Sequence, residues 1–298
     1  MAAAQRNFGP ALKHWRRERG KTQLELAMIA GYSQRHVSFL ESGRSRPSRT
    51  TVIVLAEALD VPIKERNGLL NAAGFAPAYS SEAIDSSALA PAIDALDVVL
   101  ESHRPFPAIV VDRGWNTYAG NDNAFALFST FLADPSAMLS TPNAMQLCLD
   151  TNGLRPFIVN WREFTASLLV RLRHELAFDG EDATLRALVD KIEADEEFTR
   201  YQRASDAPAS PVATLSLARD GKRIDLFTLI SSFGTPTDAT LAELRVETFF
   251  PANARSRTIL ESIDADLSSA NPSRATALPL AAWRNDLPVP KGTAHARA

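Results

Sequence analysis

The sequence predicts two domains of different class: an N-terminal all-α domain of five helices, and a C-terminal α+β domain with an antiparallel sheet and a helical insert. The chain has 298 residues, of which 45% are hydrophobic, and this is enough for two buried cores. Up to residue 75 the apolar residues recur at helical spacing between glycine and proline breaks. From residue 105 onward, short runs of β-forming residues enclose a longer helical stretch.

The N-terminal region contains two short helices joined by a glycine turn. Thr22 and Glu25 have the spacing of a capping box, so a helix is expected to begin at Gln23. Gly31 ends that helix because glycine tolerates left-handed backbone angles, and Ser33 caps the next one. Two helices joined in this way have the form of a helix-turn-helix. Three further helices are expected around the pair, at 8–20, 50–60 and 63–75.

The charge is divided along the chain. Residues 1–78 hold 12 Lys and Arg against 6 Asp and Glu, a net charge of +6. The rest of the chain holds 20 against 29, a net charge of −9. A basic first quarter on an acidic body predicts an anionic partner for the N-terminal domain alone.

Several functional classes are excluded by what the sequence lacks. Cys148 is the single cysteine, so we expect a small core residue there, without a disulfide or a zinc site. There is no nucleophile elbow, P-loop or dinucleotide fingerprint, and the five histidines are scattered, so we expect no catalytic residues, metal or cofactor. No run of eighteen apolar residues and no secretory signal is present, which predicts a cytoplasmic protein without a membrane partner.

Residues 8–75 resemble the helix-turn-helix domain of the XRE/Cro/C1 family of bacterial and phage regulators. The resemblance implies binding to double-stranded operator DNA, and a structural ion pair between Arg16 and Glu41. The residues that carry it are Arg16, Thr22, Gln23, Leu26, Ala27, Gly31, Ser33, Val37, Ser38, Leu40, Glu41, Gly43, Arg44, Pro47, Ser48, Leu55, Ala56, Ala58 and Leu59.

In such a domain the second helix of the pair enters the major groove with its N-terminal residues at the base edges. Glutamine suits adenine and arginine suits guanine, so Gln34 and Arg35 are expected to read bases. His36 and Ser38 could contact bases or backbone, and Phe39 could touch a thymine methyl group or simply pack. The remaining expected DNA contacts are Gln23 and Ser33 at helix N-termini, and Arg44, Arg46 and Arg49 in the loop after the recognition helix, where they would neutralise phosphates.

The C-terminal half alternates between strand and helix signals. Asp220-Gly221 supplies the backbone angles of a tight hairpin turn. The expected helices are 88–103, 122–133, 160–178 and 181–194, and the expected strands are 108–112, 116–120, the 212–233 hairpin and 244–252. The predicted boundaries are therefore 1–76 for the helix-turn-helix domain, 77–88 for a linker, 89–265 for the α+β domain and 266–298 for a tail rich in Pro, Ala and Ser.

Residues 89 to about 255 resemble the MmyB-like ligand-binding domain, which has a PAS-like fold. The matching stretches are 105–128, 161–173, 185–202 and the final hairpin. The resemblance implies a small apolar ligand such as a fatty acid, held as an effector rather than as a cofactor.

An acyl chain needs a long apolar cavity with one or two hydrogen-bond donors at its mouth. Core packing competes with this role for the aromatic candidates, ion pairing competes for the arginines, and Asn121 could instead form a turn. Arg171 and Arg173 are further candidate donors. The predicted ligand residues are Trp115, Tyr118, Asn121, Asn123, Phe125, Phe128, Trp161, Arg162, Phe164, Leu168, Phe227 and Phe249.

These features together predict a transcription regulator that binds its operator as a homodimer and responds to an apolar ligand in its C-terminal domain. One alternative keeps the DNA-binding module but makes the C-terminal domain a ligand-free platform for dimerisation or protein interaction. Another makes the chain a ligand carrier whose N-terminal domain only docks proteins.

Overall fold

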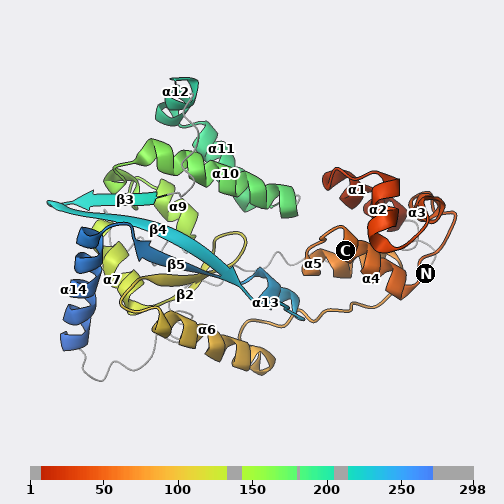
Figure 1. The fold of residues 1–298 in the computed structure, drawn as a ribbon, viewed down its shortest axis with the longest axis horizontal. Coiled ribbons are helices and arrows are strands. Elements are labelled where there is room, and N and C mark those ends of the chain that lie inside the picture. Colours follow the sequence, from red (N-terminus) through yellow and green to blue (C-terminus); the bar gives the residue numbers. More distant parts are fainter. Residues whose placement is uncertain (1–7, 133–142, 180–181, 205–213, 271–298) are drawn as a thin grey trace, which may run out of the picture. The chain divides into compact units, whose positions relative to one another are not determined.

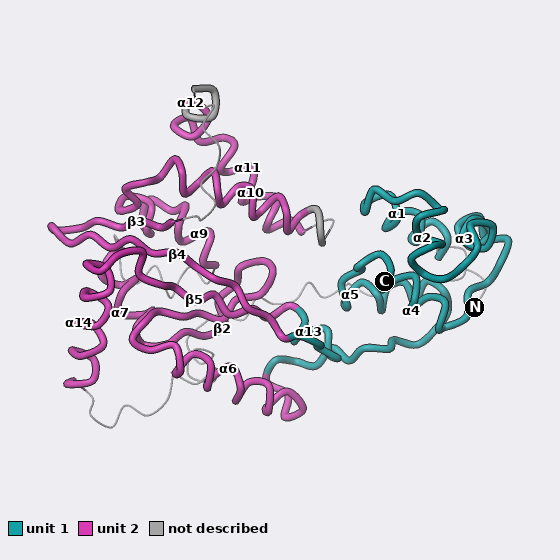
Figure 2. Tube along the Cα trace, in the orientation of Figure 1, with its two compact units in different colours: residues 1–84, 177–180, 234–242 teal, residues 85–176, 181–233, 243–298 magenta. Residues whose placement is uncertain are grey.

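The computed structural model describes residues 8–132, 143–179, 182–204 and 214–270, with the side chains of 177–179 and 201–204 left out. It contains two compact units, drawn in different colours in Figure 2. Unit 1 comprises residues 1–84, 177–180 and 234–242, and unit 2 comprises the remainder. The boundary between Ile84 and Asp85 lies inside the expected linker. Most of the tail, from residue 271, lies outside the described residues.

Unit 1 contains the five expected helices among its described residues. They are α1 (Phe8–Glu18), α2 (Gln23–Ala30), α3 (Gln34–Glu41), α4 (Arg49–Ala58) and α5 (Ile63–Ala72). The capping box at the start of α2 is present, with the Thr22 hydroxyl accepting from the amide of Glu25 and the Glu25 carboxylate accepting from the amide of Thr22. Gly31 ends α2 at φ 72°, in the left-handed region. Local capping therefore sets the boundaries that the sequence predicted.

The core of unit 1 is built from one apolar stripe of each helix. The first helix contributes Phe8, Leu12 and Trp15, which pack with buried residues of α2 to α5. The outer face of α2 is apolar as well as its inner face, since Leu24, Met28 and Ile29 are all at least half exposed.

Unit 1 also includes a pairing between two segments that are far apart in the sequence. Ser80 and Asp238 form a parallel bridge, and the amide of Ala239 donates to the carbonyl of Ser80. Asp238 is buried and caps the short helix α13 (Ala239–Glu243), while its other carboxylate oxygen accepts from the amide of Glu82. The linker is thus held to the connection between two strands of the sheet.

Unit 2 is built on an antiparallel sheet whose five strands, among the described residues, have the order β2-β1-β5-β4-β3 (Figure 1). The strands are β1 (Ala108–Val111), β2 (Thr117–Gly120), β3 (Thr214–Arg219), β4 (Lys222–Ser232) and β5 (Arg245–Pro251). The hairpin turn between β3 and β4 uses positive φ at Asp220 and Gly221, as predicted. The expected α+β class and antiparallel sheet are confirmed.

Helices cover both faces of this sheet. The helices of unit 2 in its described part are α6 (Ala90–Ser102), α7 (Asp122–Phe131), α9 (Ala144–Leu149), α10 (Trp161–Asp179), α11 (Ala183–Glu193), α12 (Glu196–Ala204) and α14 (Ala254–Ala270), with 3-10 turns η2 (Ser87–Leu89) and η3 (Arg155–Phe157). Figure 1 shows α6 and α10 on opposite sides of the sheet. Arg171 of α10 contacts Glu247 of β5, whereas His103, directly after α6, packs on Phe250 of the same strand. Because successive residues of a strand point to opposite faces of the sheet, the two helices lie on different faces.

Among the described residues, five helical segments were not expected from the sequence: α13, most of which belongs to unit 1, and α9, η3, α12 and α14 of unit 2. The last of these continues through Ala270, so a helix occupies the first five positions of the predicted tail. Leu260 of this helix is fully buried in the unit 2 core, and this burial stabilises a segment whose own composition resembles a linker.

Candidate functional site

The recognition helix α3 is positioned by its cap and by a buried ion pair. Ser33 accepts a hydrogen bond from the amide of His36 at 3.2 Å, which starts the helix. At the C-terminal end of α3, Glu41 forms an ion pair with Arg16 of α1. The Nε atom of Arg16 lies 2.5 Å from Oε1 of Glu41, and its Nη2 atom lies 3.0 Å from Oε2. Arg16 and Glu41 are both buried, so the predicted ion pair is confirmed and fixes α3 against α1.

Gln23 joins this ion pair. Its side-chain amide donates to Glu41 Oε2 at 2.8 Å. Burial alone would raise the pKa of Glu41, but the hydrogen bonds from Arg16 and Gln23 outweigh it and hold that pKa below its usual value. The side chain of Gln23, which was predicted to help bind a phosphate, therefore forms a structural hydrogen bond with Glu41.

The outward face of α3 is polar and cationic. Gln34 and Arg35 are exposed at its N-terminal end, while His36 and Ser38 are half-buried. Phe39 lies between two cations, with the Arg35 guanidinium 5.1 Å and the Arg44 guanidinium 6.0 Å from its ring centroid. Phe39 thus serves as an aromatic surface on which two arginines rest.

Arginines continue beyond the end of α3, and one of them is placed differently from the prediction. Arg44 and Arg46 lie exposed in the loop after α3, as expected. Arg49 is not in that loop but is the first residue of α4, because Ser48 caps this helix. Its guanidinium donates to the carbonyl oxygens of Ala76 and Pro77 at 3.2 and 3.3 Å.

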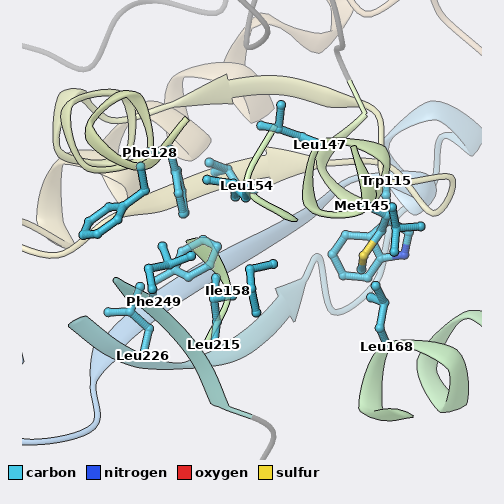
Figure 3. Close-up of a cluster of buried hydrophobic side chains, with 14 of the residues drawn as sticks. Trp115, Phe128, Met145, Leu147, Leu154, Ile158, Leu168, Leu215, Leu226 and Phe249 are labelled. Carbon is cyan, nitrogen blue, oxygen red and sulfur yellow. The ribbon is translucent and has the colours of Figure 1, made fainter. Parts of the chain in front are cut away.

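Unit 2 contains a predominantly apolar cavity between the sheet and the helices packed on it. Figure 3 shows the cluster of buried hydrophobic side chains to which lining residues such as Phe128, Met145 and Phe249 belong. The space open to the centre of a water molecule is about 100 Å³. Since one water needs roughly 10–15 Å³ by this measure, the cavity has room for about seven to ten non-hydrogen atoms. Its lining is Ile109, Thr117, Phe128, Ala144, Met145, Leu147, Cys148, Leu154, Phe164, Ser167, Leu168, Arg171, Thr214, Leu215, Thr228, Glu247 and Phe249.

Four of the predicted ligand residues line this cavity: Phe128, Phe164, Leu168 and Phe249. Phe128 of α7 and Phe249 of β5 meet edge to face with ring centroids 5.2 Å apart. The cavity therefore brings together aromatic residues that lie more than one hundred positions apart in the chain.

The other predicted aromatic residues lie outside the cavity lining. Trp115 and Trp161 are buried in the surrounding core. Phe125 is 42% exposed on the opposite side of α7 from the core residues of that helix. Phe227 stacks on Phe250 at the other face of the sheet, and the Tyr118 hydroxyl donates to Asp112 at 3.1 Å. Core packing accounts for the two tryptophans, and the other three side chains lie away from the cavity.

The predicted polar donors also have structural partners. Asn121 caps α7 and donates to the carbonyl oxygens of Leu100 and Phe106. Asn123 donates to the carbonyl oxygen of Pro105 and to Asp264. Arg162 is exposed and lies 3.5 Å from Glu197. Arg171, by contrast, is the one arginine among the described residues that line the cavity.

Arg171 pairs there with an acid that sequence reasoning missed. Its Nη1 is 3.1 Å from Oε1 of Glu247, and its Nη2 donates to the Thr228 hydroxyl at 3.4 Å. Cys148, expected to be an ordinary core residue, lies in the same wall. Burial, with a smaller contribution from the Glu247 charge, raises the pKa of this thiol to about 12. Glu247 is the one acidic residue of the expected strand 244–252, and this was the signal that could have pointed to it.

Comparison with known proteins agrees with this division of the chain. Residues 93–263 match the family described as MmyB-like transcription regulator ligand binding domain, and residues 12–66 match a helix-turn-helix family. The first match alone covers more than half of the chain. The chain belongs to the MmyB-like transcription regulators.

A curated relative matches the DNA-binding part. The protein called "Uncharacterized HTH-type transcriptional regulator y4dJ", from Sinorhizobium fredii (strain NBRC 101917 / NGR234), is 48% identical over 46 residues. This stretch is 15% of the chain and spans 60% of that relative. The family matches are to transcription regulators and not to enzymes. In the described part of the chain, no helix is long and apolar enough to cross a membrane.

Proposed function

We propose that this MmyB-like regulator binds an operator sequence through α3, as a homodimer, and that a small apolar ligand with a fatty acid-like chain changes its operator affinity. The observation that carries the proposal is the apolar cavity in the same chain as an exposed, cationic recognition helix. The ligand acts as an effector, and no cofactor is required. A regulator of this type works in the cytoplasm, where its DNA is.

Sequence readout is assigned to the start of α3. Gln34 and Arg35 are exposed there and carry the side chains that pair with adenine and guanine edges. Arg44 and Arg46, exposed in the following loop, supply affinity without sequence preference because they face the phosphate backbone.

Coupling between ligand and DNA is assigned to the linker. Residues 80–82 pair with 238–240, the connection between β4 and β5. These two strands carry the cavity residues Thr228, Glu247 and Phe249. A ligand that favours one arrangement of the strands would thereby favour one arrangement of the linker.

Operator binding is tested with the full chain and with sites selected from random DNA. Arg35→Ala is expected to weaken binding by about 1–3 kcal/mol and to relax the preference at one base position. Arg44→Ala is expected to weaken binding to all DNA sequences alike. It should also reduce the slope of log binding constant against log salt concentration by about one. Arg17→Ala removes an exposed arginine of α1 and is the matched control. If Arg35→Ala leaves sequence preference unchanged, α3 is not the reading element.

Ligand dependence is tested on the same operator with octyl, decyl and dodecyl compounds. Ala144→Leu narrows the cavity from its wall and is expected to abolish the ligand response while leaving DNA binding intact. A wild-type protein that retains operator binding but responds to none of these compounds would favour the interaction-platform alternative. A protein without any sequence-specific DNA binding would favour the carrier.

A further inference from the structure

The polar end of the cavity is a closed ion pair. Among the described residues that line the cavity, Arg171 and Glu247 are the only charged ones, so the formal charge of the lining is zero. The Glu247 side chain is 8% exposed and the Arg171 side chain 29%. The cavity therefore offers a cation that an acid on its own wall already neutralises.

Arg171 is held in this position from several sides. Beyond its contacts with Glu247 and Thr228, its guanidinium lies 5.2 Å from the ring centroid of Trp115. One turn further along α10, Glu175 binds Arg245 of β5 through two contacts of 2.5 and 2.7 Å. Two ion pairs of opposite polarity thus join α10 to β5, and Arg171 belongs to this structural connection.

An anionic ligand would disturb this end of the cavity in two ways. A carboxylate that binds Arg171 competes with Glu247 for the same guanidinium, and weakening the partner of a buried acid is disfavoured. The incoming carboxylate would also lie beside the Glu247 charge, where two like charges repel in a water-poor environment. An uncharged hydroxyl or amide avoids both effects. It can hydrogen-bond to Thr228, Ser167 or the free lone pairs of Glu247 while the ion pair stays closed.

We propose that the cavity selects uncharged amphiphiles, such as alcohols or amides with a medium-length alkyl chain, over carboxylate anions, and that Glu247 is the residue that excludes the anion. The inference rests on the proposed function and narrows its ligand: the chain is fatty acid-like, and the headgroup is neutral. The available volume suits an octyl compound of about ten non-hydrogen atoms.

The test is calorimetric titration of the full chain with octan-1-ol and with octanoate at pH 8, where octanoate is fully ionised. Octan-1-ol is expected to bind wild-type protein at least tenfold more tightly. Glu247→Gln removes the excluding charge and leaves Arg171 without its acid, so this variant is expected to reverse the preference toward octanoate. Hydrogen-exchange protection of β5 checks that the variant remains folded.

Glu175→Gln is the matched control. It breaks the neighbouring ion pair between α10 and β5, but Glu175 does not line the cavity. The preference for the alcohol is expected to remain in this variant even where stability falls.

Each outcome decides a separate question. Wild-type protein that binds octanoate as tightly as octan-1-ol, or more tightly, overturns the selection for neutral ligands and leaves the proposed apolar-ligand function standing. Binding of neither compound overturns the apolar-ligand function itself, and this inference with it. A Glu175→Gln variant that also switches preference would show that loosening of α10, rather than the Glu247 charge, controls the choice.

Discussion

Helices α1 and α3 approach each other closely at Gly9, and this makes a matched pair of glycine substitutions informative. A Cβ atom at Gly9 of α1 would lie 2.6 Å from the carbonyl oxygen of Glu41 and 2.7 Å from that of Leu40, at the end of α3. Both oxygens belong to the backbone, so no rotamer change relieves the contact. Gly68 lies in the middle of α5, and a Cβ atom there would meet only the flexible end of Glu65, at 3.8 Å.

The two substitutions are expected to change the free energy of unfolding in opposite directions. Non-bonded heavy atoms prefer about 3.5–4.0 Å, so Gly9→Ala must force α1 away from α3. Overpacking of this kind costs about 1–3 kcal/mol, and it also strains the ion pair between Arg16 and Glu41. Gly68→Ala replaces glycine within a helix at an open position, which stabilises by about 0.5–1 kcal/mol.

Hydrogen exchange of the full chain measures both effects, because protection of α1 and α3 amides reports their free energy of opening. Gly9→Ala is expected to lower protection in α1 and α3, and Gly68→Ala to raise it slightly in α5. Unit 2 provides the internal reference in each sample. Equal protection in wild-type protein and Gly9→Ala would refute the close approach of α1 to α3, and with it the placement of the recognition helix.

Two further predictions concern ionisable groups. Because the pKa of Glu41 is lowered in the folded state, its contribution is complete above the unfolded value of about 4.3 and is lost as the pH falls through the folded value. Glu41→Gln should therefore destabilise by about 3 kcal/mol at pH 7 in thermal melts, with the difference shrinking as the pH falls below about 4, and a pH-independent difference would contradict the assignment. The pKa of Cys148, raised to about 12, should make its reaction with a disulfide reagent at pH 8 about a hundredfold slower than that of a free thiol, because the smaller thiolate fraction outweighs the higher nucleophilicity of that thiolate. Reaction at the rate of an exposed cysteine would show that the cavity wall is open there.

The predictions that held rest on residues close together in the sequence. The capping box at Thr22, the turn at Gly31 and the hairpin at Asp220 each depend on a few neighbouring positions, and each was found as expected. The pairing of Arg16 with Glu41 followed from a family pattern, and its geometry is now explicit.

The predictions that changed rest on distant packing. Tyr118 and Asn121 have side chains of the types that ligand sites use. In the structure, however, the Tyr118 hydroxyl donates to Asp112, and the Asn121 side chain caps α7. Arg49 was expected in a loop and lies in a helix because the cap at Ser48 precedes it. Composition alone could not separate the cavity-lining residues Phe128 and Phe249 from Phe125, which has the same chemistry on the exposed side of α7.

By itself the sequence determined the class of both domains, the boundaries of the DNA-binding helices and the polar face of the recognition helix, because capping and periodicity act within one or two helical turns. Only the tertiary structure decided which side chains enclose the cavity, and that Arg171, the one arginine among its described lining residues, is paired with Glu247, 76 positions away. It also decided that the linker is held to residues 238–240. Such contacts depend on how the sheet and its helices pack together, and no local pattern of residues specifies that packing.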